Sequence, residues 1–128
     1  MHKEILNKKM EEIGIQLSDM QTDQFLAYYD MLIERNKVMN LTAITEYKDV
    51  VEKHFVDSVS LIKAMNVEEV KNVIDIGTGA GFPGIPLKIV FPHLKVTLLD
   101  SLNKRIKFLN DVIGAVELEN IETIHGGA

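Results

Sequence analysis

The sequence predicts an α/β fold in which a cap of helices precedes a parallel, doubly wound sheet. Residues 1–66 repeat apolar side chains at the spacing of amphipathic helices, whereas residues 67–128 alternate short β-branched runs with helix-length segments. Strands that helices separate along the chain pair in parallel, because each crossover helix packs back onto the sheet. We therefore expect a helical cap over 1–66 and the first half of a sheet domain over 67–128.

Three helices are predicted in the cap. The first covers residues 3–14 and ends at Gly14, and the second begins at Ser18 or Thr22 and runs to about Met39. Residues 40–45 form a connector, and residues 46–65 form the third helix. In the second helix, the spacing of Tyr28 and Tyr29 indicates packing rather than a base-stacking platform.

The second half predicts strands at residues 73–76, 95–99 and 121–124, with helices at 85–91 and 103–113 between them. Pro86 suits the first position of a helix, because proline lacks the N–H that is unpaired there. The chain stops where such a sheet would ordinarily continue, so we expect the N-terminal part of a longer protein. An exposed edge at residues 121–124 could pair with a second copy, which gives a non-enzymatic, self-associating fragment as one hypothesis.

The composition is that of an ordinary globular chain. It has 128 residues and a net charge of -5, with 46% hydrophobic and 26% charged side chains. Because neither half is basic, charge alone gives no support for a nucleic-acid partner. The chain contains no cysteine, which excludes disulfides and thiolate metal sites and fits a cytoplasmic location. We predict no metal site and, since no apolar run approaches the roughly 20 residues of a bilayer span, no membrane segment.

Glycines cluster directly after the first predicted strand. Gly77, Gly79, Gly81 and Gly84 follow Asp75, and the next strand ends in another acid, Asp100. Glycine lacks a Cβ, so its backbone can turn tightly and approach a ligand closely. Because the carboxyl ends of parallel strands meet at one edge of a sheet, the sequence predicts a nucleotide-type crevice there.

Two phosphate-binding patterns compete for this loop. The P-loop pattern fails, because Ile85 and Pro86 stand where lysine and a hydroxyl residue are required. The dinucleotide pattern G-x-G-x-x-G occurs at residues 79–84, with Asp100 about 20 residues on, so an NAD-dependent oxidoreductase fragment is an alternative. Against it, the strand ends directly before Gly77, and the carboxylate of Asp75 would repel a pyrophosphate.

S-adenosylmethionine suits the loop better than a dinucleotide. It carries no phosphate, and its ammonium and sulfonium groups are positive, so a carboxylate at Asp75 would attract it. Asp100, at the next strand end, is placed to accept hydrogen bonds from the two ribose hydroxyls. If the glycines formed only a tight turn, Asp100 would instead cap the helix that begins near Asn103.

At these residues the chain resembles the bacterial small-subunit ribosomal RNA guanine-N7 methyltransferases, also called glucose-inhibited division protein B. The matching segments are RN at 35–36, NLTAI at 40–44, HFVDS at 54–58, DIGTGAGFPGIP at 75–86, LDSLNKR at 99–105 and FL at 108–109. The Gly-Phe-Pro-Gly continuation of the loop is more specific than the general methyltransferase pattern.

The resemblance implies a Rossmann-like fold and methyl transfer from S-adenosylmethionine to N7 of a guanine in 16S ribosomal RNA. It also implies that Gly77 and Phe82 contact the cofactor and that Ala128 lies beside its adenine, although Gly127 stands where the family usually has arginine. The family is nearly twice as long, so we expect half a pocket and reduced or no activity. We name no catalytic base, because N7 of guanine is already a nucleophile.

Two polar clusters leave alternatives open. His54, Asp57 and Ser58 share one helix face and form either a polar patch toward the crevice or an anchor between that helix and the glycine loop. Lys104, Arg105 and Lys107 form a basic cluster at a helix start, with Lys88 and Lys95 expected nearby. Such a cluster is more often a solvated helix face than a contact for a phosphate backbone.

Overall fold

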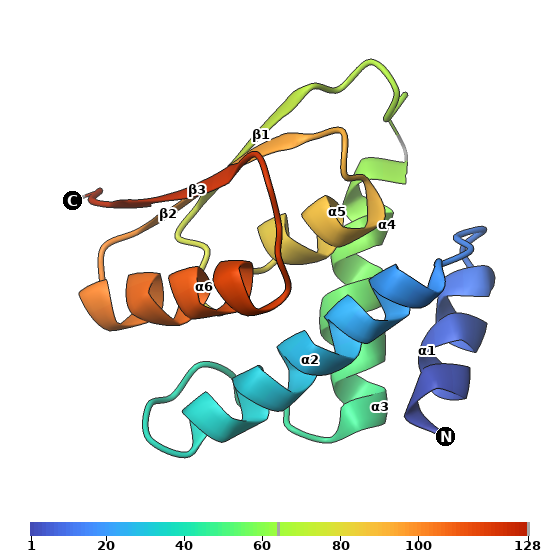
Figure 1. Cartoon of the computed structure of the whole chain (residues 1–128), viewed down its shortest axis with the longest axis horizontal. Helices are drawn as coiled ribbons and strands as arrows, with labels where there is room; N and C mark the ends of the chain where they lie inside the picture. Colours follow the sequence, from blue (N-terminus) through green and yellow to red (C-terminus); the bar gives the residue numbers. More distant parts are fainter. Residues whose placement is uncertain (64, 128) are drawn as a thin grey trace.

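The computed structural model describes residues 1–63 and 65–127, and Figure 1 shows a sheet beside two layers of helices. In chain order the elements are α1 (His2–Glu11), α2 (Asp19–Asn36), α3 (Tyr47–Val50), the π-helix η1 (Val51–Val56), α4 (Asp57–Lys63), β1 (Asn72–Ile76), α5 (Gly84–Val90), β2 (Lys95–Asp100), α6 (Asn103–Ala115) and β3 (Ile121–His125). No helix of the described residues has the length and apolar character that crossing a bilayer requires.

The strands of the described residues form a parallel sheet in the order β1-β2-β3, which confirms the predicted fold class. Ile76 pairs with Leu99, and Leu99 with Ile124, so the carboxyl ends of the three strands lie side by side along one edge of the sheet. Helices α5 and α6 both pack on one face of this sheet (Figure 1). The other face leaves Ile74 67% and Ile76 75% exposed.

Strand β3 lies at the edge of the described sheet, and Ile124 in it is 46% exposed. Self-association through this edge stays a prediction, which light scattering over a range of concentrations tests. The opposite edge, β1, carries the more exposed apolar side chains.

The third cap helix differs from its prediction. The structure divides it into α3, the π-helical η1 and α4, of which α4 covers Asp57–Lys63. In η1 the carbonyl of His54 accepts hydrogen bonds from the N–H of Asp57 and from the hydroxyl of Ser58. A π-helical turn takes more residues than an α-helical turn, so it changes which side chains share a face.

Several helix boundaries also differ by a few residues; α1, for example, ends at Glu11 and not at Gly14. Helix α5 begins at Gly84, so Pro86 is its third residue and not its first; its missing N–H still falls within the first turn. Helix α2 ends at Asn36, before Met39, because the side chain of Asn36 accepts hydrogen bonds from the N–H groups of Leu41 and Thr42 at 2.7 and 3.0 Å. That side chain starts the connector.

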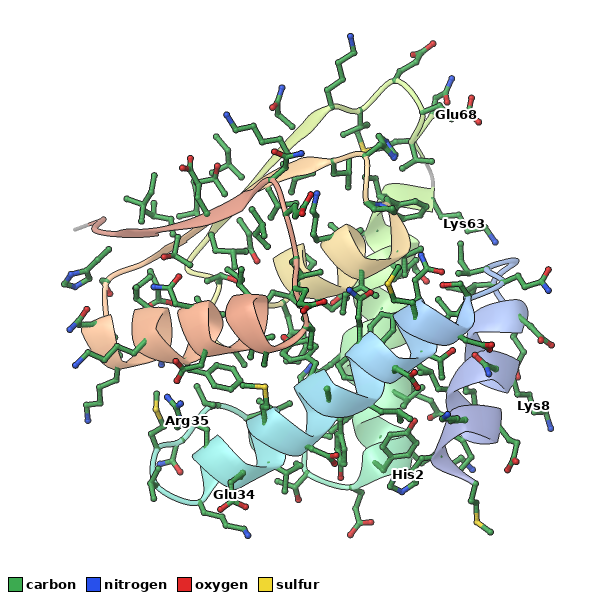
Figure 2. The ribbon with its side chains drawn as sticks, in the orientation of Figure 1. His2, Lys8, Glu34, Arg35, Lys63 and Glu68 are labelled. Atoms are coloured by element: carbon green, nitrogen blue, oxygen red, sulfur yellow. The ribbon has the colours of Figure 1, made fainter. Side chains whose placement is uncertain are left out.

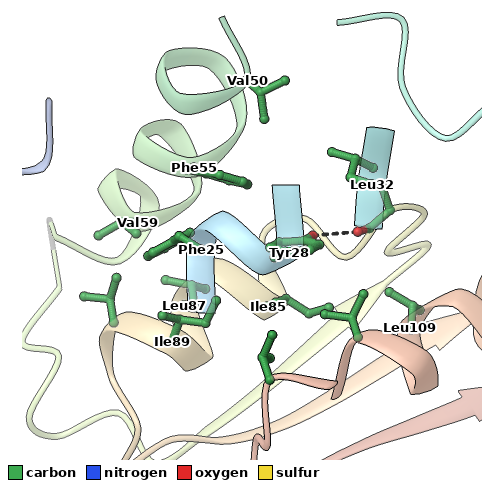
Figure 3. Packing of buried hydrophobic residues seen from close by; sticks show 14 of the residues in the cluster. Phe25, Tyr28, Leu32, Val50, Phe55, Val59, Ile85, Leu87, Ile89 and Leu109 are labelled. Carbon is green, nitrogen blue, oxygen red and sulfur yellow. Dashed lines mark hydrogen bonds between the residues drawn. The ribbon is translucent and has the colours of Figure 1, made fainter. Parts of the chain in front are cut away.

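A shared apolar core joins the cap to the sheet. Helix α2 crosses the middle of the molecule, with Phe25 and Tyr28 between Phe55 of η1 and Ile85 of α5 (Figure 3). These four side chains are fully buried. The division into residues 1–66 and 67–128 therefore describes sequence segments that pack on one another, and their status as separate domains stays a prediction.

Polar contacts reinforce the same junction. Arg35, at the end of α2, extends toward α6 (Figure 2), where it pairs with Asp111 and lies 5.4 Å from the ring centroid of Phe108. Such a cation–π contact adds to the ion pair. Gln24 of α2 donates to the carbonyl of Val116, just after α6, at 2.9 Å.

Gln21 links α2 to the end of α5. Its backbone and side chain complete a capping box with Ser18, which confirms Ser18 as the helix cap. Its amide nitrogen also donates to the carbonyls of Ile89 and Val90 at 2.9 and 3.3 Å. These carbonyls belong to the last turn of α5, where no further turn supplies a donor.

Replacing Gln21 with alanine removes the side-chain half of the capping box and both bonds to α5, whereas the backbone N–H can still donate to Ser18. We expect Gln21→Ala to lower the free energy of unfolding by about 1–3 kcal/mol, measured by urea denaturation. Met20→Ala is the matched control, because Met20 is the neighbouring residue and is 69% exposed. Equal denaturation midpoints for the two variants would contradict the role of Gln21.

Candidate functional site

The glycine loop folds over the end of β2. The N–H groups of Gly77 and Thr78 both donate to the carbonyl of Leu99, at 2.8 and 3.1 Å. Gly77, Gly79 and Gly81 have φ angles of 69°, 60° and 103°, which residues with a side chain rarely adopt. The loop needs glycine at these positions to reach β2 and turn back to α5.

The glycines have two kinds of surroundings. A Cβ on Gly81 would lie 2.7 Å from the hydroxyl of Tyr28, and one on Gly84 would lie 2.3 Å from Cδ2 of Leu98. A Cβ on Gly77 or Gly79 would meet no heavy atom of the described residues within 4 Å. Gly81 and Gly84 therefore permit internal packing, whereas the backbone at Gly77 and Gly79 faces space that a ligand can enter.

Asp75 holds the loop from inside. Its side chain is 7% exposed, and its Oδ2 accepts hydrogen bonds from the hydroxyl of Thr78 at 2.6 Å and the N–H of Gly84 at 2.9 Å. Burial raises the pKa of Asp75, as does the nearby charge of Asp100, although the two hydrogen bonds oppose the shift. The carboxylate thus connects β1, the loop and the start of α5.

Asp100 holds the loop from the next strand. Its side chain is 2% exposed, its Oδ2 accepts from the N–H of Gly79 at 2.8 Å, and its Oδ1 accepts from the N–H of Leu102 at 3.0 Å. Burial would raise the pKa of Asp100, but these N–H groups and the guanidinium of Arg105, 3.6 Å away, together lower it. The lowered pKa keeps this carboxylate ionised at neutral pH.

Phe82 occupies the last part of the loop. Its half-buried ring stacks on the imidazole of His54, with 4.3 Å between centroids and 9° between planes. Tyr28 lies behind it, 5.8 Å away between centroids, and donates from its hydroxyl to the carbonyl of Ala80 at 2.6 Å. The prediction that Tyr28 is a packing residue is confirmed, but its bond to the loop was not foreseen.

The polar cluster on the third cap helix acts as an anchor. His54 contacts Phe82, and its Nε2 lies 2.9 Å from Oγ1 of Thr42 in the connector. The Ser58 hydroxyl donates to the carbonyl of His54, whereas Asp57 is exposed. The structure therefore supports the interpretation in which this helix is fastened to the glycine loop.

The structure brings most of the predicted site residues together. Those that gather where β1 and β2 end are Asp75, Gly77, Gly79, Gly81, Phe82 and Asp100. Ala128 lies outside the described residues; the N–H of Gly126 donates to the carbonyl of Asp100 at 3.0 Å, which places Gly126 beside the end of β2. The cofactor contacts of these residues stay predictions at this point.

The expected position of Lys88 is wrong. Lys88 is 3% exposed, and its Nζ donates to the carbonyls of Pro92 and Leu94 at 2.9 and 2.6 Å. Burial lowers its pKa, against an opposing effect of Glu119. This lysine secures the end of α5 and is not part of an exposed basic cluster.

The packing around the loop predicts a contrast between two glycines. Gly84→Ala would place its Cβ 2.3 Å from Leu98 and 3.1 Å from Oδ2 of Asp75, so we expect urea denaturation to show a loss of about 1–3 kcal/mol or more. Gly114→Ala, in α6 with open surroundings, should instead gain about 0.5–1 kcal/mol. Similar midpoints for both variants would refute the close approach of Gly84 to β2.

The lowered pKa of Asp100 predicts how stability depends on pH. Because this pKa is lower in the folded state, the stabilisation is fully present above the unfolded value of about 3.9 and is lost as pH falls through the folded value. We expect Asp100→Asn to be less stable at neutral pH and to lose less stability on acidification. Parallel curves of unfolding free energy against pH for the wild type and this variant would exclude the effect.

A solved structure shares this arrangement of helices and strands. It is a crystal structure of a provisionally assigned caffeoyl-CoA O-methyltransferase from Staphylococcus aureus, and it matches with a TM-score of 0.57 over 98% of this chain and 50% of that one. The sequences are 16% identical, so the match shows the fold alone. The fold is thus of the Rossmann-like methyltransferase type.

Sequence comparison gives much closer relatives. Ribosomal RNA small subunit methyltransferase G from Lachnoclostridium phytofermentans is 57% identical over 119 residues, covering 93% of this chain and 49% of that protein. The protein of the same name from Alkaliphilus metalliredigens is 52% identical over 126 residues, covering 98% and 53%. The chain therefore spans about half the length of the curated relatives that it matches.

A family model gives the same result over most of the chain. The model for GidB, rRNA small subunit methyltransferase G, matches residues 21–128, which include the connector, the glycine loop and both acidic strand ends. With this match and relatives of this similarity, the chain belongs to the GidB family of rRNA small subunit methyltransferases.

Proposed function

We propose that this chain carries the S-adenosylmethionine site of a methyltransferase that acts on N7 of a guanine in 16S ribosomal RNA. The observation that carries the proposal is the open backbone at Gly77 and Gly79, flanked by the carboxylates of Asp75 and Asp100. The names of the relatives, all ribosomal RNA small subunit methyltransferases, support the substrate class and a cytoplasmic location beside the ribosome.

The charges at this edge fit a cationic ligand. Asp100 is ionised at neutral pH, and a positive group in the crevice would interact favourably with it and would favour the charged form of Asp75. A carboxylate offers about four lone-pair sites, so Asp100 keeps sites for ribose hydroxyls beyond its two backbone partners and Arg105. Gly81 and Phe82 continue the same loop, and we assign Phe82 to contact with the cofactor.

For this methyl transfer the main task of the protein is to orient the reacting atoms. S-adenosylmethionine supplies an electrophilic methyl group, and N7 of guanine has a lone pair and no proton to lose. The residues of this chain therefore need not remove a proton in the transfer; their part is to hold the reacting atoms in line and to limit water. This accounts for a site whose described residues include structural carboxylates but no pair of groups set up as acid and base.

The length of the chain bears on its own activity. It spans about half of its relatives, and we propose that it binds the cofactor but transfers methyl groups weakly or not at all. The NAD-dependent oxidoreductase alternative rests on the pattern at residues 79–84 and gains no support from these relatives. Within that pattern Gly81 and Gly84 serve internal packing.

A calorimetric titration distinguishes the two cofactors. We expect saturable binding of S-adenosylhomocysteine to this chain and no saturable heat with NAD. Asp100→Asn should weaken the binding about ten-fold or more, because it removes a charged acceptor. Asp23→Asn, an exposed carboxylate of α2 that pairs with Lys3, is the matched control and should bind like the wild type.

Three results of these titrations would contradict parts of the proposal. Saturable binding of NAD alone would favour the oxidoreductase alternative. Equal affinity of the wild type and Asp100→Asn, with both folded by circular dichroism, would reject the ribose role of Asp100. A folded wild type that binds neither molecule would reject the proposal that this half alone forms the cofactor site.

A further inference from the structure

We propose that His54 is a positioning residue for the cofactor loop: it fixes the ring of Phe82 between the loop and the connector at residues 40–45. The inference rests on the proposed function in taking this loop as the cofactor-binding element. It adds a residue from the helical cap to the site, and it gives the connector a part in shaping that site.

Phe82 depends on a neighbouring ring for its orientation. The residue before it, Gly81, has a φ of 103°, and the ring is only half-buried, so neither side-chain bulk at 81 nor full enclosure fixes it. Three aromatic rings lie within about 6 Å, at 4.3 Å (His54), 5.8 Å (Tyr28) and 6.1 Å (Phe55) between centroids. His54 is the nearest of them and alone lies parallel to Phe82 within 9°.

Hydrogen bonds hold His54 in place. Its Nε2 lies 2.9 Å from Oγ1 of Thr42, and its backbone carbonyl accepts the hydroxyl of Ser58. Burial lowers the pKa of His54, although Asp57 opposes the shift, so the imidazole is neutral at pH 7. A ring that is held at its edge by Thr42 presents a fixed face to Phe82.

Thr42 is in turn held by hydrogen bonds. Its hydroxyl oxygen accepts from the N–H of Ile44 at 3.0 Å, and its own N–H donates to the side chain of Asn36 at 3.0 Å. A continuous series of contacts therefore runs from the end of α2 through Thr42 and His54 to Phe82. The connector has no regular secondary structure, so these bonds determine where Thr42 lies.

The core below this series is complete without it. Tyr28 and Phe55 are fully buried and contact each other, whereas His54, Thr42 and Phe82 are half-buried. Loss of the imidazole should therefore leave the fold in place and loosen Phe82. This separates a positioning role from a purely structural one.

Calorimetry with S-adenosylhomocysteine tests the series. We expect His54→Ala to weaken binding about ten-fold, through loss of both the stack and the hydrogen bond. His54→Phe keeps a stacking ring but loses the contact with Thr42, so it should weaken binding about five-fold. Thr42→Val loses that contact and also the bonds between its hydroxyl and Ile44, so it should weaken binding at least as much. Because the contact between the two side chains is absent from both variants, the double variant should bind no more weakly than Thr42→Val alone.

Tyr29→Phe is the matched control. It removes a hydrogen bond to the same connector, from the Tyr29 hydroxyl to the carbonyl of Thr45 at 2.9 Å, but it does not touch His54 or Phe82. Its affinity should equal that of the wild type. Unchanged affinity in His54→Ala, or additive losses in the double variant, would overturn the proposal.

A second measurement does not depend on the cofactor. With fluorinated phenylalanine in the chain, Phe82→Leu identifies the fluorine resonance of Phe82. In His54→Ala we expect that resonance to move toward the position of a solvent-exposed ring, while those of the core phenylalanines stay in place. If the wild type does not bind S-adenosylhomocysteine, the proposed function fails but this resonance still decides whether His54 positions Phe82; an unmoved resonance means that it does not.

Discussion

The buried carboxylate of Asp75 is the constraint on which the rest of the site depends. It lies within β1, yet one of its oxygens binds both the hydroxyl of Thr78 and the N–H of Gly84. Burying a carboxylate is unfavourable unless hydrogen bonds compensate, and the raised pKa of Asp75 records that balance. The loop must bring two donors to this point, and Gly84 can approach only because it has no Cβ to meet Leu98. The strand, the loop and the start of α5 therefore form one unit.

The helical cap is part of the same unit, because α2 supplies both core and site contacts. One face of Tyr28 belongs to the aromatic core with Phe55, and its hydroxyl holds the loop at Ala80. Burial raises the pKa of Tyr28 well above its ordinary value, so the phenol stays protonated and a donor at neutral pH. A change in the packing of α2 would consequently alter the position of the loop. The unit that holds the glycine loop thus includes helices that lie far from the glycines in sequence.

The helices and strands could be predicted from local sequence patterns, whereas the contacts between residues distant in sequence could not. Short β-branched runs, helical spacing and the glycine cluster gave the parallel sheet and the loop, and Ser18 gave the start of α2, because each signal lies within a few residues. The bond from Tyr28 to Ala80 joins residues 52 positions apart, and that from Thr42 to His54 depends on a π-helical turn with no clear sequence signal. The buried state of Lys88 was missed for a different reason. Its amine donates to the carbonyls of Pro92 and Leu94, only four and six residues on, and no local pattern shows that these carbonyls turn toward it.

The positions of Asp75 and Asp100 were predicted from the sequence, but their hydrogen bonds to the backbone of the loop were not. The sequence placed Asp75 and Asp100 at adjacent strand ends, as observed, but as groups presented to a ligand. In the structure each first organises backbone N–H groups of the loop, and their pKa values move in opposite directions. Burial outweighs the two hydrogen bonds at Asp75, whereas the N–H groups of Leu102 and Gly79, together with Arg105, outweigh burial at Asp100. An anion at this edge would add repulsion to an unfavourable burial, whereas a cation would relieve it. The same contacts that hold the loop together therefore favour a positively charged cofactor over a pyrophosphate.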